Sequence, residues 1–500
     1  MNVSLLDNIA LGFSVALSLN GLMYCFLGVF LGTVVGVLPG LGTMATLAVL
    51  MPITFHIEPT YSIIMLAGIY YGAAYGGSTA SILLNLPGTV TSVVTTLDGY
   101  PMARNGQAGL ALFITAIASF VGSMLGAVLL AVLTIPLANV AMSFGPQEYF
   151  MLMTFGLVSA SLLSSGKPLK SLIMVCIGVL LGLIGLDLNS GEARFTFGLP
   201  VLFDGLSLVA LALGLFGLPE IISTAHGGPE GKVAENRITL RSMLPDRAQV
   251  RECTMPTLRG SAIGSFFGAL PGTGGLIATF LSYALEKRVS RTPEKFGHGA
   301  LAGVAAPEAA NNAAVQTAFI PTMSIGIPGD AVMAMMLGVL MVHGIIPGPA
   351  VISNNPEIFW GLVASFVVGN ILLVILNVPL VGLWVRLLRI PYHLLFPVMV
   401  ACVCVGVYSV SSSVTDIYVL VIFGLLGLLF RALQFDGATL LLGFVLGPMV
   451  EENFRRTMVV AQGDFATFIE RPISATLLAI MLLMLLFFVV RFLHAVLKRA

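Results

Sequence analysis

Charged side chains are scarce in this sequence and make up 9% of its 500 residues. Soluble domains carry about 25% charged residues. Hydrophobic residues account for 57% of the chain, so its polar side chains are too few to cover a surface that faces water. The composition therefore excludes an ordinary soluble protein and predicts that lipid surrounds most of the chain.

Residues that bind metals or perform catalysis are also few or poorly spaced. The five cysteines lack metal-ligand spacing, and the six histidines form no HExxH or other paired-ligand pattern. No Ser/His or Asp/Asp pair suits an intramembrane enzyme, and no GxxxxGK[ST] phosphate loop occurs. We expect no enzyme, no metal site and no cofactor beyond a coupling ion. The formal net charge of +0 gives no indication of nucleic acid.

Glycine and proline, by contrast, are abundant inside the apolar stretches. The chain has 55 Gly and 26 Pro, and membrane helices contain both residues more often than soluble helices do. A crossing needs about 20 apolar residues, and several stretches here are too short or too broken to cross alone. We predict an all-α polytopic membrane protein with about 10–12 transmembrane helices and additional re-entrant pieces.

One sizeable hydrophilic stretch, residues 223–259, interrupts the apolar segments. Its basic residues are Lys232, Arg237, Arg241, Arg247, Arg251 and Arg259. Because loops rich in Lys and Arg stay in the cytoplasm, we expect this linker there. It divides the chain into a first membrane repeat, 1–222, and a second membrane repeat, 260–500.

The next basic segment, 287–295, also predicts a cytoplasmic loop. Only one hydrophobic stretch, 260–285, lies between this segment and the linker. If both basic segments are cytoplasmic, the stretch enters the membrane and returns, with its turn at Pro271-Gly272. The alternative is a single kinked span that leaves the second basic segment outside.

An internal repeat relates the two halves. The first copy is Gly28-x3-Gly32-x3-Gly36-x-Leu38-Pro39-Gly40-x-Gly42, and the second is Gly260-x3-Gly264-x3-Gly268-x-Leu270-Pro271-Gly272-x-Gly274. A weaker pair follows in the same order, because segments 82–88 and 323–329 are both apolar and end on Pro-Gly. The first copy has no basic flank, since no Lys or Arg precedes Arg104. This difference favours two homologous halves inserted as inverted repeats.

The four Pro-Gly breaks predict a central site lined by broken helices. Proline removes a backbone donor, and glycine accepts a positive φ. The half-helix after each break presents free N–H groups and the positive end of its dipole, which favour a carboxylate. The predicted substrate-binding glycines are Gly40, Gly42, Gly88, Gly272, Gly274 and Gly329. The alternative is that each Pro-Gly only kinks a packed helix.

Polar residues inside the apolar segments complete the predicted site. Ser81, Asn85, Asn311 and Asn312 are candidates to bind substrate, because such side chains in a membrane segment are costly and usually functional. Glu308 is the candidate carrier of a proton or sodium ion.

Three further charged residues lie beside a break or in a polar turn. Asp330 follows the break at 328–329, where it either couples an ion or only caps the next half-helix. Asp98 and Arg104 flank a polar turn, and we interpret them as loop anchors.

Several of these stretches together resemble the TctA family, the large membrane subunit of tripartite tricarboxylate transporters. The matching motifs are 36–42, 75–88, 97–103, 303–312 and 443–449. The resemblance spans nearly the whole chain. It implies a secondary transporter in the bacterial cytoplasmic (inner) membrane that imports an organic carboxylate, for example a di- or tricarboxylate such as citrate.

The resemblance also implies partners and a driving force. The partners are a small TctB-like membrane subunit and a periplasmic TctC-like solute-binding protein that delivers the substrate. An H+ or Na+ gradient drives uptake. The alternative is a stand-alone carboxylate channel or permease that works without a binding protein.

The basic segments yield a test of topology. Single cysteines placed in 223–259 and in 289–297 are both expected to react with an impermeant thiol reagent only from the cytoplasmic side, because both segments are basic. Reaction of a cysteine in 289–297 from outside would contradict the re-entrant interpretation of 260–285. A cysteine-free background supplies the control.

Overall fold

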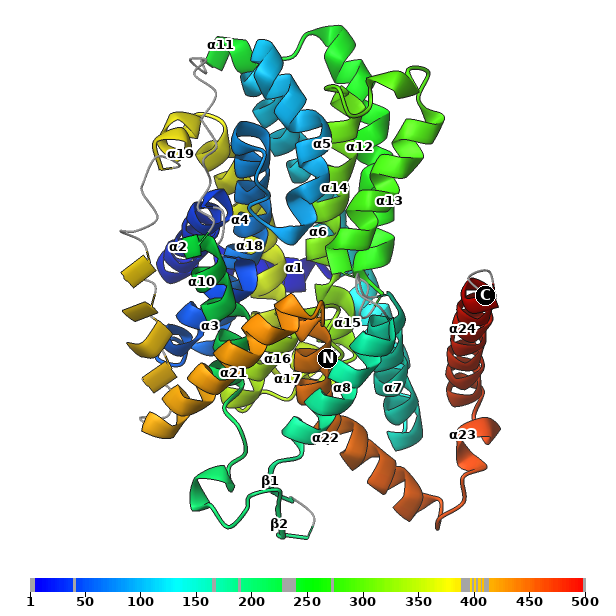
Figure 1. The fold of residues 1–500 in the computed structure, drawn as a ribbon. Coiled ribbons are helices and arrows are strands. Elements are labelled where there is room, and N and C mark those ends of the chain that lie inside the picture. The colour runs from blue at the N-terminus through cyan, green and yellow to red at the C-terminus, as the bar shows by residue number, and fades with distance from the viewer. Residues whose placement is uncertain are drawn as a thin grey trace. The chain divides into compact units, whose positions relative to one another are not determined.

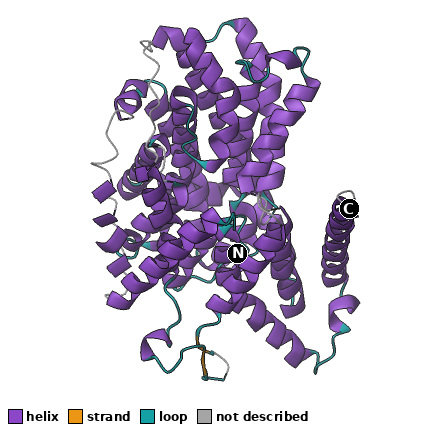
Figure 2. Ribbon diagram, viewed as in Figure 1, coloured by secondary structure: helices purple, strands orange, loops and turns teal. Residues whose placement is uncertain are grey.

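Helices make up most of the structure, in agreement with the all-α prediction (Figure 2). The computed structural model describes residues 5–38, 42–163, 168–187, 190–226, 240–270, 274–387, 396–397, 400–401, 403–405, 407–408 and 413–497. Within these ranges the only strands are β1 (Gly185–Leu186) and β2 (Ala193–Arg194), which pair antiparallel.

The described residues form two compact units, and each is treated by itself. The first unit contains the described residues of 1–138, 207–270 and 274–428, and the second contains those of 139–206 and 429–500. Two helices, α6 (Ala108–Ala141) and α21 (Val414–Ala432), begin in the first unit and end in the second. The predicted repeats are defined by sequence similarity rather than by compactness, so their boundaries stay a prediction.

The first unit holds elements from both predicted repeats (Figure 1). From the first repeat come α1 (Leu5–Ala16), α2 (Leu19–Val37), α3 (Thr43–Thr54), α4 (Pro59–Leu84), η1 (Val90–Ser92), α5 (Val93–Met102), η2 (Ala103–Gln107), α9 (Leu208–Ala212), η4 (Leu213–Gly217) and α10 (Leu218–His226). The linker contributes α11 (Leu240–Met243). From there on come α12 (Arg247–Gly268), α13 (Gly274–Val289), η5 (Pro293–Lys295), α14 (Leu301–Thr317), α15 (Phe319–Ser324), α16 (Ala331–Val342), α17 (Pro349–Asn354), α18 (Pro356–Asn377) and α19 (Val381–Leu387).

Several helices begin where the sequence supplies a cap. The Ser18 side chain accepts a hydrogen bond of 3.0 Å from the Gly21 N–H at the start of α2. Asp246 and Gln249 form a capping box at the start of α12, so this helix begins inside the hydrophilic linker. Pro59 occupies the first turn of α4, where its missing N–H costs nothing.

The glycines of the repeated motif bring two pairs of helices to backbone contact. A Cβ atom added to a motif glycine of α2 would lie 2.3 or 2.4 Å from a carbonyl oxygen of α4, and the pairs are Gly28–Met65, Gly32–Ile69 and Gly36–Ala73. A Cβ atom added to a motif glycine of α12 would lie 2.1–2.4 Å from a carbonyl oxygen of α14, and the pairs are Gly260–Ala306, Gly264–Ala310 and Gly268–Ala314. At these six positions only a hydrogen atom fits.

The pair of α2 and α4 corresponds to the pair of α12 and α14, because equivalent motif glycines contact equivalent positions. Met65 and Ala306 are as far apart along the chain as Gly88 and Gly329, the last residues of the weaker sequence match. In this register α4 corresponds to α14 followed by α15. The packing therefore supports the duplication, whereas the inverted orientation of the halves stays a prediction.

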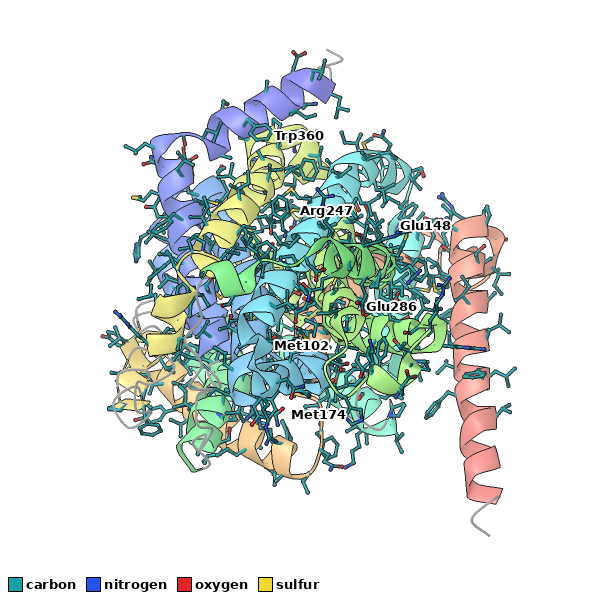
Figure 3. The ribbon with its side chains drawn as sticks, turned by 90° about the horizontal axis from the view of Figure 1, so that it is seen from above. Met102, Glu148, Met174, Arg247, Glu286 and Trp360 are labelled. Atoms are coloured by element: carbon teal, nitrogen blue, oxygen red, sulfur yellow. The ribbon has the colours of Figure 1, made fainter. Side chains whose placement is uncertain are left out.

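Helices α12 and α13 run side by side and form a hairpin (Figure 1). Arg259 of α12 donates to both carboxylate oxygens of Glu286 of α13, at 2.6 and 2.7 Å. Glu286 is buried, and Figure 3 labels it on α13. A single kinked span would place the two helices end to end, so the hairpin is the alternative that the structure shows. Its turn, with Pro271 and Gly272, lies outside the described residues.

Four helical stretches in the described ranges are long and apolar enough to cross a membrane. They are Leu19–Val37, Val90–Ala141, Pro356–Asn377 and Val414–Ala432. Shorter apolar helices, such as α3 and α16, accompany them. The total number of crossings stays a prediction.

The second unit contains α7 (Pro146–Leu163), α8 (Pro168–Gly182), η3 (Pro200–Leu202), α22 (Gly437–Val460), α23 (Thr467–Glu470) and α24 (Pro472–Leu497) besides the two strands. Ion pairs join the strand pair to α22. Arg194 contacts Asp187 at 3.1 Å and Glu451 at 2.8 Å, and Arg455 contacts the same two carboxylates at 3.1 and 2.7 Å. Each charge has two partners of opposite sign, which makes this a network rather than an isolated surface pair.

The glycine contacts yield a test of packing. Gly264→Ala is expected to destabilise the protein by about 1–3 kcal/mol, because its Cβ would lie 2.1 Å from the Ala310 oxygen. The matched control is Gly382→Ala in α19, where a Cβ meets nothing within 4 Å. Alanine there is expected to be neutral or to stabilise by up to about 1 kcal/mol. Thermal unfolding in detergent measures both, and equal melting temperatures for the two variants would contradict the packing.

Candidate functional site

Glu308 is held by hydroxyl groups from two other helices of the first unit. It lies on α14 and is 1% exposed. Thr95 of α5 donates a hydrogen bond to Oε1, and Ser119 of α6 lies 3.4 Å from Oε2. Asn312, one turn further along α14, donates to the Ser119 hydroxyl at 2.8 Å and to the Glu308 carbonyl oxygen at 3.0 Å. The predicted ion carrier and one of the predicted amides therefore share one hydrogen-bond network.

Asn311 faces a different set of groups. A Cβ atom added to Gly275 would lie 3.4 Å from Asn311 Oδ1 and 3.2 Å from the Thr91 methyl group. Asn311 is 1% exposed, and neither polar atom of its side chain has a hydrogen-bond partner in the described structure. The side chain thus lies against the first turn of α13, which begins at Gly274, and against the segment that follows the break at Pro87.

The predicted glycines have separate surroundings. Gly88 is buried so closely that a Cβ would lie 1.9 Å from the Gly36 oxygen, and a Cβ on Gly329 would lie 2.9 Å from the Ala318 oxygen. Gly42 caps α3 with a φ of 60°, next to the Glu220 side chain. An acidic neighbour disfavours an anion at that helix start. Gly40 and Gly272 lie outside the described residues.

Ser81 and Asn85 have local structural roles. The Ser81 hydroxyl is 2.9 Å from the Gly77 oxygen and 3.0 Å from the Ser92 oxygen, so it ties the segment after the break to α4. Asn85 ends α4 in the left-handed conformation, with a φ of 59°, and its side chain is exposed. Asparagine tolerates this conformation better than most residues. Neither side chain lies in the network around Glu308.

Asp330 caps α16 and also contacts the other half of the molecule. Its Oδ1 accepts a hydrogen bond of 2.9 Å from the Met333 N–H, and its Oδ2 accepts one from the hydroxyl of Tyr70 on α4. The capping alternative is therefore present in the structure. An additional role in ion coupling stays a prediction.

Asp98 is a loop anchor, as the sequence predicts, but it anchors a loop from the second half. This fully buried carboxylate accepts hydrogen bonds of 2.8 Å from the N–H groups of Gly297, Gly299 and Ala300, and one of 2.9 Å from the Tyr283 hydroxyl. It thereby positions the start of α14, the helix that carries Glu308. Arg104 is exposed.

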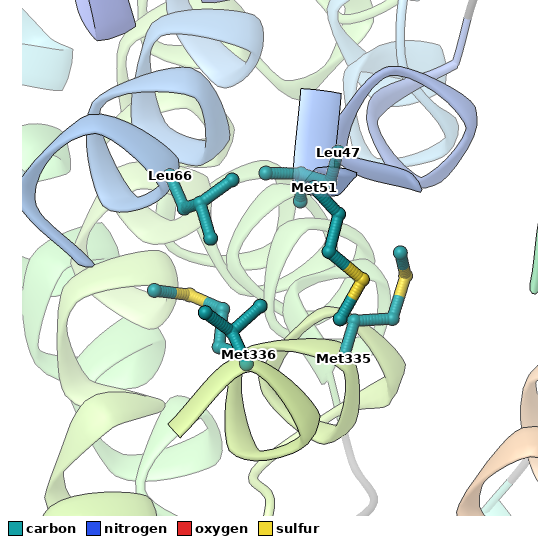
Figure 4. Close-up of a pocket in the computed structure, with 6 residues that line it drawn as sticks. Leu47, Met51, Leu66, Met335 and Met336 are labelled. Carbon is teal, nitrogen blue, oxygen red and sulfur yellow. The ribbon is translucent and has the colours of Figure 1, made fainter. Parts of the chain in front are cut away.

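A small apolar pocket contains residues that correspond, through the internal repeat, to the polar residues Thr95, Asp98 and Tyr283. Its lining residues are Leu47, Met51, Leu66, Met335, Met336 and Val339 (Figure 4). In the register of the repeat, Met336 corresponds to Thr95, Val339 to Asp98, and Met51 to Tyr283. Positions that correspond in the two halves are thus polar around Asp98 and apolar in this pocket.

Two members of the Glu308 network, Thr95 and Ser119, were not predicted from the sequence. A signal for Ser119 existed. Ser123 lies one turn after Ser119 in the apolar helix α6, and Gly122 and Gly126 follow Ser119 at helical spacing. Small and polar residues on one helix face indicate a helix–helix contact in membranes.

Comparison with known proteins identifies relatives of the chain. The profile of the Tripartite tricarboxylate transporter TctA family matches residues 22–442. A protein of Agrobacterium vitis, named as an uncharacterized 52.8 kDa protein in the TAR-I ttuC′ 3′ region, is 48% identical over 478 residues, which cover 96% of this chain and 95% of that protein. A second protein of this organism, named as uncharacterized in the TAR-II ttuC′ 3′ region, is 50% identical over 217 residues, or 43% of this chain and 90% of that protein. No solved structure matches significantly.

The Asp98 contacts yield a test of stability. Asp98→Ala is expected to destabilise the protein by at least about 2 kcal/mol, because it leaves three backbone N–H groups without their acceptor. The exposed Asp204→Ala is the control, with an expected change within about 0.5 kcal/mol. Denaturant unfolding followed by fluorescence measures the difference. Equal stability of the two variants would show that the loop is held by other contacts.

Proposed function

The chain belongs to the tripartite tricarboxylate transporter TctA family, and we propose that it imports an organic carboxylate by coupling it to an ion gradient. The family match confirms the resemblance seen in the sequence. It identifies a multi-pass membrane protein, the large subunit of a transporter that contains other subunits, and it points away from an enzyme.

The proposed transport cycle involves two partners. A periplasmic TctC-like binding protein delivers a di- or tricarboxylate such as citrate, a small TctB-like subunit accompanies this chain in the bacterial inner membrane, and H+ or Na+ enters with the substrate. The family name supports the substrate class and the multi-subunit assembly. A stand-alone channel would need neither a binding protein nor a gradient.

The observation that carries the proposal is the position of Asn311. Its buried side chain lies against the first turn of α13, with the Thr91 methyl group nearby, and its polar atoms have no hydrogen-bond partner among the described residues. The first turn of a helix presents free N–H groups and positive dipole charge. The free N–H groups of the first turn of α13 and the unpartnered side-chain N–H of Asn311 are donors that suit a carboxylate. We place one carboxylate group of the substrate there.

Glu308 supplies the coupling in this proposal. It is one turn away from Asn312 and its hydrogen-bond partners in the described structure are neutral. An ionised carboxylate in such surroundings needs a cation, and binding of H+ or Na+ meets that need. Because Asn311 follows three residues after Glu308, cation and substrate bind close together on one helix.

Asn311→Ala tests the substrate site. We expect it to raise the substrate concentration for half-maximal uptake about 10-fold, the effect of one lost hydrogen bond to a charged group. Asn85→Gly is the matched control, because glycine keeps the left-handed helix end and the exposed Asn85 amide is not needed. Uptake into proteoliposomes with the binding protein and small subunit measures both. The opposite ranking of the two variants would overturn the assignment.

Glu308→Gln tests coupling. Glutamine keeps the shape and one acceptor oxygen but removes the charge, and its NH2 group can donate to the hydroxyl that met the second carboxylate oxygen. Substrate binding should therefore persist while ion-driven accumulation stops. Counterflow and gradient-driven uptake in the same vesicles separate these two activities. Accumulation at the wild-type level, with unchanged dependence on pH and sodium, would show that coupling resides elsewhere.

A further inference from the structure

Polar atoms without hydrogen-bond partners gather along one face of α14. Glu308, Asn312 and Gln316 are four residues apart and therefore lie on the same side of the helix, and all three are buried. The Asn312 Oδ1 atom and both polar atoms of Gln316 have no partner in the described structure. Buried side-chain polar atoms are normally paired, so such a group of exceptions needs a physical cause.

Helix α6 presents a matching set of groups to this face. Gly122 and Gly126 let α6 approach closely, since a Cβ atom on Gly122 would lie 2.3 Å from the Ala309 oxygen and one on Gly126 would lie 2.7 Å from Gln316 Cβ. Ser119 and Ser123 lie on the same stretch of α6. The two helices therefore contact each other through polar groups, and next to these groups their backbones approach closely at the glycines.

Two more oxygens belong to this group. The Tyr75 hydroxyl of α4 lies next to the Ser123 hydroxyl and within electrostatic range of Glu308. Both hydroxyls are buried, and neither has a hydrogen-bond partner of good geometry. Helices α4 and α6 thus place these two buried hydroxyls beside each other and near Glu308 of α14.

The hydrogen bonds of Asn312 fix the direction of its amide oxygen. Both N–H groups of Asn312 are used, one by the Glu308 carbonyl oxygen and one by Ser119, so the amide oxygen points away from them. Ser119 accepts from Asn312, and its own proton is directed at Glu308 Oε2. Thr95 donates to the other oxygen.

We propose that a sodium ion binds between α4, α6 and α14, with Glu308, Asn312 Oδ1, Gln316 Oε1, Ser123 and Tyr75 as its oxygen ligands. The proposal rests on the proposed function, because it identifies the coupling ion. One carboxylate among neutral oxygens balances a single positive charge. Calcium sites contain more carboxylates, and the described part of the chain has no group of three His, Cys, Asp or Glu side chains placed to hold a metal ion. A proton would occupy one oxygen of Glu308 and leave the Asn312 and Gln316 amide oxygens without a partner in the described structure.

The adjacent amides then serve opposite charges. Asn312 binds the cation, and its neighbour Asn311 faces the carboxylate on another side of the same helix. Opposite charges bound to adjacent residues of one helix attract each other, and the resulting coupling between the two sites is reciprocal. Sodium is expected to raise the affinity for substrate by the same factor by which substrate raises the affinity for sodium.

Sodium-dependent thermal stability tests the site directly. Purified chain in detergent is heated in NaCl, KCl or choline chloride at equal ionic strength, and the wild type is expected to melt higher in NaCl because bound ligand stabilises the folded state. Ser123→Ala and Gln316→Leu are expected to lower the sodium affinity about 10-fold or more. The matched control is Asn370→Leu in α18, which also has a buried, unpartnered amide oxygen and an amide N–H bonded one turn back, and it should keep the sodium response.

The outcomes separate this proposal from the proposed function. An unchanged sodium response in both site variants, or a wild type stabilised by acidic pH and not by sodium, would overturn the sodium site. Carboxylate uptake driven by a proton gradient without sodium would overturn it too, while leaving the transport function in place. A sodium response lost in the two variants, in a protein that takes up no carboxylate, would support the site and contradict the transport function.

Discussion

Close contact between helix backbones at glycine is the constraint on which the rest of the first unit depends. In lipid the hydrophobic effect does not drive helices together, so association depends on van der Waals contact and on hydrogen bonds between helices. The three motif glycines in each half bring α2 onto α4 and α12 onto α14 at distances that exclude any side chain. These contacts hold α4 and α14 in place, and α14 carries Glu308, Asn311 and Asn312. Loss of the glycine contact would therefore displace the polar residues together.

Much of the fold follows from patterns that the sequence displays openly. The low charge and the apolar stretches predict a helical membrane protein, and the repeated motif predicts two homologous halves. The hairpin of α12 and α13 was one of two alternatives that the sequence left open, because two basic segments flank one apolar stretch. Each of these features depends on residues that are neighbours along the chain.

The candidate site was predictable only in part, because its contacts join distant segments. Glu308 and Asn312 stand out as polar residues in an apolar helix, but nothing local shows that Thr95 and Ser119 reach the same carboxylate. Ser81 and Asn85 stand out equally, yet a hydrogen bond to Ser92 and a left-handed helix end account for them. A polar residue near a break can bond to the backbone or to a ligand, and the residue type alone does not distinguish the two roles.

The Asp98 anchor has a consequence for how the chain is made. The residue lies in the part that leaves the ribosome first, and its three backbone partners lie about two hundred residues later. Until the second part arrives, the carboxylate has no donors, and until the first part is present the start of α14 has no acceptor. The two halves are therefore not independent folding units, and Glu308 reaches its final environment only after most of the polypeptide has entered the bilayer. A fragment that carries the second half alone would retain its motifs but not the start of the helix on which they act.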